Sequence, residues 1–343
     1  RDWEGTQPDP AFFARTYSVQ PTDIIPTPKR AVAPQERPAG WYRLTLDSEG
    51  NASVESADED GARYAILPGD PGRCEQIAAL LDDLQRNFSV EAGTEITLEA
   101  NPGTLTDTFV EALVRNGISR VSLGVQSFDD GELSFLGRVH TAGQAFKAAE
   151  MVRRAGIDNL NCDLIFGFPG QTMESWKRTL RSAVDAGAEH ISFYSLQVEE
   201  GTKLYDMVMK GELTQPDEEL DRAMYEDAVD FLASSGFGHY EISNAAKPGR
   251  ECRHNLIYWS MGTYAGAGAA AHSFLGGCRF SNPDSVGEYL EKIRSARDPD
   301  GAVDYAKLHP MEPESRDELI TDCIFTTLRK REGRSEERRV GKE

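Results

Sequence analysis

The chain has 343 residues, 39% of them hydrophobic and 27% charged, with a formal net charge of -20. This composition is enough to bury one large core or two modest cores. The negative charge argues against a nucleic-acid partner, and no apolar run approaches the roughly 20 residues that a membrane span requires. The first residues show no basic segment followed by an apolar one, so we expect a cytoplasmic protein.

The five cysteines are odd in number and widely scattered, which favours reduced thiols over a disulfide framework. They are Cys74, Cys162, Cys252, Cys278 and Cys323, and the sequence contains no CxxC or CxxxCxxC motif. We therefore predict no metal site from the cysteines.

The two ends of the chain differ in character from the middle. Residues 1–73 are rich in proline and contain an acidic cluster at Asp58-Glu59-Asp60, and only 41–46 and 62–67 have strand-like patterns. We expect a divergent, partly disordered extension there. Residues 333–343 are almost entirely charged or glycine, and we interpret them as a non-native tail.

A repeated pattern organises the middle of the chain. An amphipathic helix over 75–88 comes first, and then three helices each end in a glycine, Gly117, Gly156 or Gly187, shortly before a strand-like segment. Parallel strands are predicted over 95–101, 120–127, 159–168 and 190–197. Either a barrel or a doubly wound sheet fits this βα repeat, although no GxGxxG motif supports the dinucleotide-binding form of the latter.

The repeat fades after residue 197. Helices are predicted over 203–212, 217–235, 284–296 and 315–330, with a short strand over 239–243 and a loop-rich segment over 245–280.

Polar side chains at the ends of the predicted strands are candidates for a binding site, because α/β folds place their chemistry there. Glu99 is either an acceptor for ligand hydroxyls or an ammonium, or a solvated strand end. Gln126 occupies the matching place on the next strand. Asp163 interrupts an apolar strand, so it should point into a polar cavity or pair with an arginine.

Two further side chains suit ligand binding. Arg138 is a candidate partner for Asp163 or for a ligand carboxylate, since its planar guanidinium binds carboxylates bidentately; alternatively, it is an exposed arginine before a helix. His254 lies in the aromatic segment RHNLIYW (253–259), which suggests a flat cofactor such as haem or a structural, hydrogen-bonded histidine.

At these residues the chain resembles the radical S-adenosylmethionine proteins of the oxygen-independent coproporphyrinogen III oxidase group, in particular the HemW branch of haem chaperones. The resemblance covers residues 75–335 and is carried by EITLEANPGT (95–104), VSLGVQSFDDGELSFLGRVHT (121–141), NCDLIFGFPGQT (161–172) and the RHNLIYW segment. The GVQSF and LGRVH forms favour HemW over the oxidase.

The resemblance implies an α/β fold, a partial TIM-type (β/α) barrel followed by a smaller C-terminal α+β domain. We expect the extension over 1–73, the barrel over 74–236, the C-terminal HemW-like domain over 237–332 and the tail over 333–343. The positions of Glu99, Gln126, Arg138 and Asp163 resemble those that hold S-adenosylmethionine in the family, with carboxylates for the ribose and ammonium and arginine for the methionine carboxylate. His254 is a candidate haem contact.

One departure from the family is large. Family members carry CxxxCxxC, which holds a [4Fe-4S] cluster, and a GGGTP loop, but this sequence has neither. We favour an altered or misread start joined to a genuine HemW body over a homologue that lost its cluster. In either case, we expect no reductive cleavage of S-adenosylmethionine by the sequence as it stands, and we assign no catalytic residue.

The function that follows is haem binding and transfer to a haem-accepting protein. Two alternatives remain: an oxygen-independent coproporphyrinogen III dehydrogenase of porphyrin biosynthesis, and a cluster-free module that binds S-adenosylmethionine or haem.

Overall fold

The computed structural model describes residues 42–46, 52–56, 64–68, 74–87, 90–214, 217–297, 303–309 and 313–333. The chain forms two compact units. The larger unit comprises residues 62–78, 90–264 and 314–343, and the smaller comprises residues 1–61, 79–89 and 265–313. The domain boundaries expected from the sequence stay a prediction.

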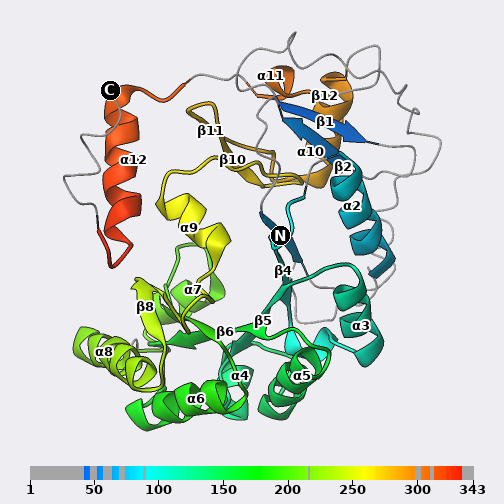
Figure 1. The fold of residues 1–343 in the computed structure, drawn as a ribbon. Helices are drawn as coiled ribbons and strands as arrows, with labels where there is room; N and C mark the ends of the chain where they lie inside the picture. Colours follow the sequence, from blue (N-terminus) through cyan, green and yellow to red (C-terminus); the bar gives the residue numbers. More distant parts are fainter. Residues whose placement is uncertain are drawn as a thin grey trace. The chain divides into compact units, whose positions relative to one another are not determined.

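A seven-stranded sheet forms the centre of the larger unit, with strand order β3-β4-β5-β6-β7-β9-β8 (Figure 1). Strands β3 to β7 pair in parallel, whereas β9 is antiparallel to β7 and β8 is antiparallel to β9. The strands are β3 Tyr64–Pro68, β4 Glu95–Ala100, β5 Arg120–Gln126, β6 Asn159–Phe166, β7 His190–Ser195, β8 Gly238–Glu241 and β9 Asn244–Ala246. The predicted α/β fold with a parallel central sheet is thus confirmed, and the arrangement is that of a partial (β/α) barrel.

Helices follow the parallel strands and cover the outer face of the sheet (Figure 1). They are α3 Asp107–Arg115, α5 Ala142–Arg154 and α6 Met173–Asp185, and α8 Glu218–Ser234 packs against α6. Side-chain oxygens cap all three strand-linked helices: Thr106 caps α3, and capping boxes begin α5 at Thr141 and α6 at Thr172. The apolar stripes of these helices bury Phe109 and Trp176 completely.

The inner face of the sheet is polar instead of apolar. Strand register places Glu99 of β4 opposite Ser122 of β5, Ser122 opposite Asn161 of β6, and Asn161 opposite His190 of β7. Side chains alternate between the two faces of a strand, so the intervening residues Leu98, Val121, Leu160 and Ile191 point to the other face, and each of them is 0% exposed. A polar inner layer with buried members needs internal hydrogen bonds or a ligand.

The other elements of the larger unit are short or terminal. They are η4 Pro102–Thr104, α4 Asp130–Phe135, α7 Lys203–Met209, α9 Arg253–Trp259 and α12 Arg316–Leu328. Helix α2, Cys74–Asn87, has residues in both units. The helix that we predict over 75–88 is therefore confirmed, as are those over 203–212, 217–235 and 315–330 apart from their ends.

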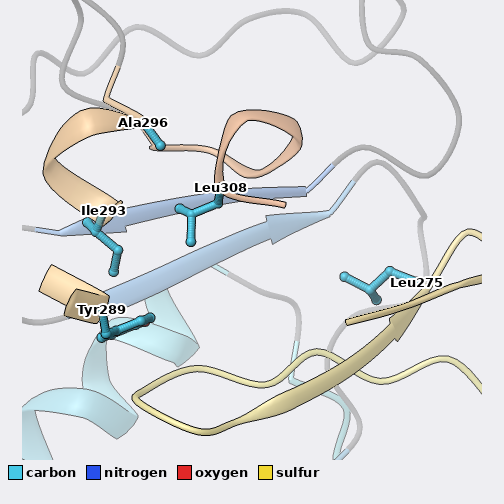
Figure 2. Packing of buried hydrophobic residues seen from close by; sticks show 5 residues of the cluster. All are labelled: Leu275, Tyr289, Ile293, Ala296 and Leu308. Carbon is cyan, nitrogen blue, oxygen red and sulfur yellow. The ribbon is translucent and has the colours of Figure 1, made fainter. Parts of the chain in front are cut away.

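The smaller unit combines short strands and helices. Strand β1, Tyr42–Leu46, lies between β12, Val303–Asp304, and β2, Ala52–Ser56, in an antiparallel sheet. The hairpin β10 His272–Leu275 with β11 Cys278–Ser281, and the helices α10 Val286–Ser295 and α11 Tyr305–Leu308, complete the described part of this unit. Its core is a cluster of buried apolar side chains: Leu275, Tyr289, Ile293, Ala296 and Leu308 (Figure 2).

The sequence-based prediction of a loop-rich segment over 245–280 is wrong in part, because β9, α9, β10 and most of β11 lie in it. These elements have three to seven residues each, too few for a periodic pattern to emerge. The four cysteines whose side chains are described form no disulfide with one another. Most of residues 1–73 and nearly all of 333–343 lie outside the described residues.

Candidate functional site

The four residues predicted to bind S-adenosylmethionine line one cavity at the carboxyl ends of the parallel strands. Its volume is about 410 Å³, within the usual range for small-molecule sites. The lining residues are Glu99, Gln126, Arg138, Asp163, Ile165, Tyr194, Ser195, Leu196 and Gln197. The structure therefore brings together the four predicted side chains, which are spread over 64 positions of the sequence from Glu99 to Asp163.

Glu99 supplies one negative charge to the cavity from β4. Its side chain is exposed to the opening, and it forms no hydrogen bond or ion pair within the described residues. Protein on either side nevertheless partly desolvates the carboxylate, which raises its pKa; the charge of Asp163 raises this pKa further, and Arg120 opposes the shift. Both oxygens of Glu99 are thus available to a ligand that can donate hydrogen bonds.

Gln126 ends β5 in a strained conformation. Its φ is +66°, in the left-handed region that residues other than glycine rarely adopt. The strain coincides with a register shift in the pairing of β5 with β6 between Leu123 and Gln126. This bulge re-aims the side chain of Gln126, which lines the cavity. A Cβ on Gly124 would lie 3.1 Å from Gln126 Nε2, so the glycine leaves room for this amide.

Asp163 supplies the second negative charge, from β6. Ser122 Oγ donates to its Oδ2 at 3.1 Å and Asn161 Nδ2 donates to its Oδ1 at 2.7 Å. Burial raises the pKa of Asp163, and these two hydrogen bonds together with the charge of Arg120 oppose the shift. The carboxylate is therefore oriented by donors on the protein side and faces the cavity on the other side.

Arg138 supplies the positive charge. It follows helix α4. Within the described residues its guanidinium forms no ion pair, and in particular none with Asp163. Desolvation lowers the pKa of Arg138 and the charge of Asp163 opposes this change, but an arginine stays protonated in proteins. An unpaired guanidinium at the edge of a cavity suits a ligand carboxylate.

His254 is not among the residues that line this cavity. It lies on α9, where its Nε2 forms a hydrogen bond with Tyr258 Oη. Burial lowers the pKa of His254 to about 4, and the positive charge of Arg120 acts in the same direction. The imidazole is therefore neutral at physiological pH, the form that ligates a metal or donates a single hydrogen bond.

The sequence analysis missed the residues that β7 and the following loop bring to the cavity. Tyr194, Ser195, Leu196 and Gln197 all line it, and the side chain of Tyr194 is 42% exposed. The signal was available, since the end of β7 corresponds to the strand ends that carry Gln126 and Asp163.

No three His, Cys, Asp or Glu side chains among the described residues could together hold a metal ion. The donor set found in the described part of the chain therefore does not fit a [4Fe-4S] cluster. Within the same residues, no helix combines the length and apolar character that crossing a bilayer requires.

Comparisons with known proteins show the family of the chain. The model of the radical SAM superfamily matches residues 57–183, which contain strands β3 to β6 and the four predicted binding residues Glu99, Gln126, Arg138 and Asp163. The heme chaperone HemW of Bacillus subtilis is 36% identical over 308 residues, which cover 89% of this chain and 79% of that protein. The chain belongs to the HemW family.

Other members and a related fold support this assignment. The heme chaperone HemW of Mycobacterium tuberculosis H37Rv is 37% identical over 281 residues, covering 82% of this chain and 69% of that protein. Among solved structures, coproporphyrinogen III oxidase (HemN) from Escherichia coli matches with a TM-score of 0.61 and 21% identity, over 77% of this chain and 63% of that chain. At that identity HemN supports the fold alone.

Proposed function

We propose that this chain is a haem-binding and haem-transferring protein that holds S-adenosylmethionine in the cavity at the strand ends. One observation carries the ligand assignment: two carboxylates and one guanidinium, none of them in an ion pair within the described residues, converge on the same cavity. The similarity to the heme chaperones supports the haem-handling part.

The charges of the cavity complement the groups of S-adenosylmethionine. The ligand carries an ammonium, a carboxylate, a sulfonium and two ribose hydroxyls. Glu99 and Asp163 would accept hydrogen bonds from the ammonium and the hydroxyls, and Arg138 would bind the carboxylate bidentately. The amide of Gln126 can donate and accept, which suits the remaining polar edge of the ligand. S-adenosylmethionine bound to a reduced cluster supplies radical chemistry in this superfamily, but no such step is assigned to the residues described.

The assignment is tested by pairing a protein change with a ligand change. Isothermal titration calorimetry should show that Arg138→Gln weakens S-adenosylmethionine binding at least tenfold, because a charge-assisted, bidentate contact is lost. The same variant should bind decarboxylated S-adenosylmethionine as the unchanged protein does. Arg178→Gln, at an exposed arginine of α6, is the matched control. Equal losses for both ligands would show that Arg138 does not bind the carboxylate.

His254 is the proposed haem contact. The neutral imidazole lies beside Tyr258, whose ring packs against that of Tyr264 with the centroids 4.4 Å apart. Neutral imidazole is the form that ligates haem iron, and aromatic rings suit the flat porphyrin. A titration with haemin followed by its absorbance should show a shifted Soret band that His254→Ala removes and that the exposed-residue control His272→Ala keeps. An unchanged band in the His254 variant would refute this assignment.

Coproporphyrinogen III dehydrogenase, the alternative that the sequence leaves open, is a second candidate function. Ser127, which distinguishes the sequence from the oxidase branch, is fully buried and bonds to Glu132 and Thr179, so it packs behind the cavity instead of lining it. Anaerobic incubation of a cluster-complete version with coproporphyrinogen III separates the candidates, since only the dehydrogenase consumes it.

A further inference from the structure

A continuous line of buried hydrogen bonds extends from the cavity into the sheet behind Asp163. It passes through Asn161, which is next but one to Asp163 on β6, and reaches His190 on β7, directly opposite Asn161. Asn161 is 1% exposed and His190 is 0% exposed. Neither residue lines the cavity, so the ligand site described above does not account for them.

The carboxylate of Asp163 determines which way the Asn161 amide points. An atom of that amide lies 2.7 Å from Asp163 Oδ1, and an ionised carboxylate only accepts hydrogen bonds. The atom must therefore be Nδ2, because an amide oxygen there would place two acceptors in contact. Asn161 Nδ2 also donates to Ser122 Oγ at 2.7 Å, so both of its hydrogens are used. The amide oxygen then faces β7.

The orientation of Asn161 determines the tautomer of His190. Asn161 Oδ1 lies 2.6 Å from His190 Nδ1 and 3.2 Å from Ser192 Oγ, which donates to it. Because an amide oxygen has no hydrogen, Nδ1 of His190 must carry the proton. Burial lowers the pKa of His190 well below its ordinary value, and the ring is neutral. Its Nε2 is consequently an acceptor.

The remaining ring nitrogen is satisfied from the other side. Tyr240 Oη lies 2.7 Å from His190 Nε2 and donates to it, and the same Oη accepts a hydrogen bond of 3.2 Å from the backbone N–H of Cys252. Every donor in this series therefore points towards Asp163: Cys252 N–H, Tyr240 O–H, His190 Nδ1–H and Asn161 Nδ2–H. Hydrogen bonds arranged head to tail polarise one another and strengthen the last donor.

We propose that His190 is a positioning residue of the ligand site: as the Nδ1–H tautomer it locks the Asn161 amide, which holds Asp163 as an oriented acceptor for the hydroxyl or ammonium groups of the ligand. The effect on ligand binding rests on the proposed function. The tautomer and the orientation of Asn161 do not, since they are properties of the protein alone.

The charged groups around this line favour the same arrangement. Arg120, 3% exposed and in no ion pair within the described residues, points from β5 into the same inner face. Burial raises the pKa of Asp163 and lowers that of His190; the positive charge of Arg120 acts towards a lower pKa in both, so it favours an ionised carboxylate beside a neutral ring. The other ionisable groups that face Asp163 are Glu99 from β4, Arg138 from the loop after α4 and Tyr194 from β7.

The first test needs no ligand. Long-range ¹⁵N–¹H correlation spectra of the histidine rings report which ring nitrogen carries the proton, and the spectrum of His190→Asn identifies the His190 signals among the six histidines. We expect a neutral ring protonated at Nδ1 at neutral pH. A ring protonated at Nε2, or at both nitrogens at neutral pH, would overturn the proposal.

The second test separates positioning from a merely structural role. An asparagine side chain places an N–H donor where the Nδ1–H of histidine lies, whereas leucine has no donor. Calorimetric titration of His190→Asn with S-adenosylmethionine should give an affinity within about twofold of the unchanged protein, and His190→Leu should be about fivefold weaker, as for one lost neutral hydrogen bond.

The outcomes are distinct. Equal affinities of the two variants would refute the positioning role, even if the tautomer is as expected. If the unchanged protein does not bind S-adenosylmethionine at all, the proposed function fails, and the ring tautomer still decides whether the line of donors exists. Should His190→Leu not fold, His190→Ala replaces it in the same titration, since alanine likewise has no donor for Asn161 Oδ1 and should also bind about fivefold more weakly than the unchanged protein.

Discussion

Replacing Glu99 by glutamine separates ligand binding from folding more cleanly than any other change in the cavity. The substitution removes the charge and keeps the shape of the side chain. Glu99 forms no hydrogen bond or ion pair within the described residues, so no such contact of the described fold is lost. The raised pKa of Glu99 shows that its charged form is disfavoured by desolvation and by Asp163, and removing the charge should not lower stability.

The loss of affinity follows from the bond that the carboxylate would make. A hydrogen bond to a charged group contributes about 1.5–3 kcal/mol, and 1.4 kcal/mol corresponds to a factor of ten in affinity. Glu99→Gln should therefore bind S-adenosylmethionine roughly tenfold to hundredfold more weakly. Binding should also weaken as the pH falls, beginning above the pH at which an ordinary glutamate titrates, because protonation removes the same charge.

Calorimetric titration and thermal unfolding on the same samples test this reasoning. Glu150→Gln is the matched control, since Glu150 is exposed on α5 and is not among the residues that line the cavity. An affinity within twofold of the unchanged protein would show that Glu99 does not contact the ligand. A large fall in unfolding temperature with Glu99→Gln would show instead that the carboxylate has a structural partner.

Four further outcomes are expected. Gly124→Ala should weaken S-adenosylmethionine binding several-fold in calorimetry, because its Cβ would press on the amide of Gln126, and unchanged binding would show that Gln126 is not involved. Thr141→Ala should lower the free energy of unfolding in urea by about 1 kcal/mol through loss of the α5 capping box, with restoration by Thr141→Ser. Trp176→Ala should lower the free energy of unfolding by roughly 3–5 kcal/mol in the same measurement, since the ring is fully buried and its Nε1 donates to the Met224 carbonyl at 2.8 Å. A loss below about 1 kcal/mol would contradict this packing. The pKa of His254 is about 4 in the folded protein and near 6.5 in the unfolded chain, so the unfolded chain binds the proton first as the pH falls. The free energy of unfolding should therefore fall by on the order of 1–3 kcal/mol between pH 6.5 and pH 4. His254→Gln should reduce this pH dependence.

Much of the architecture followed from local patterns. Alternating residues in β4 and β5 and a glycine at the end of each preceding helix predicted the βα repeat, because strand period, helix caps and left-handed turns are properties of a few neighbouring residues. The convergence of Glu99, Gln126 and Asp163 was likewise predictable, since the carboxyl ends of parallel strands meet at one edge of a sheet. The strand-end argument did not extend to β7, where Tyr194 completes the cavity.

The sequence by itself determined the order and kind of the central strands and helices and the family to which the chain belongs. Only the tertiary structure decided the register that sets His190 beside Asn161, the left-handed backbone of Gln126 and the exclusion of His254 from the cavity lining. The physical reason is that periodicity and capping act over one or two turns, whereas the register and the bulge at this site depend on partners far along the chain, such as Asn161 and His190, which are 29 residues apart. A tautomer fixed through a neighbouring amide belongs entirely to this second kind of information.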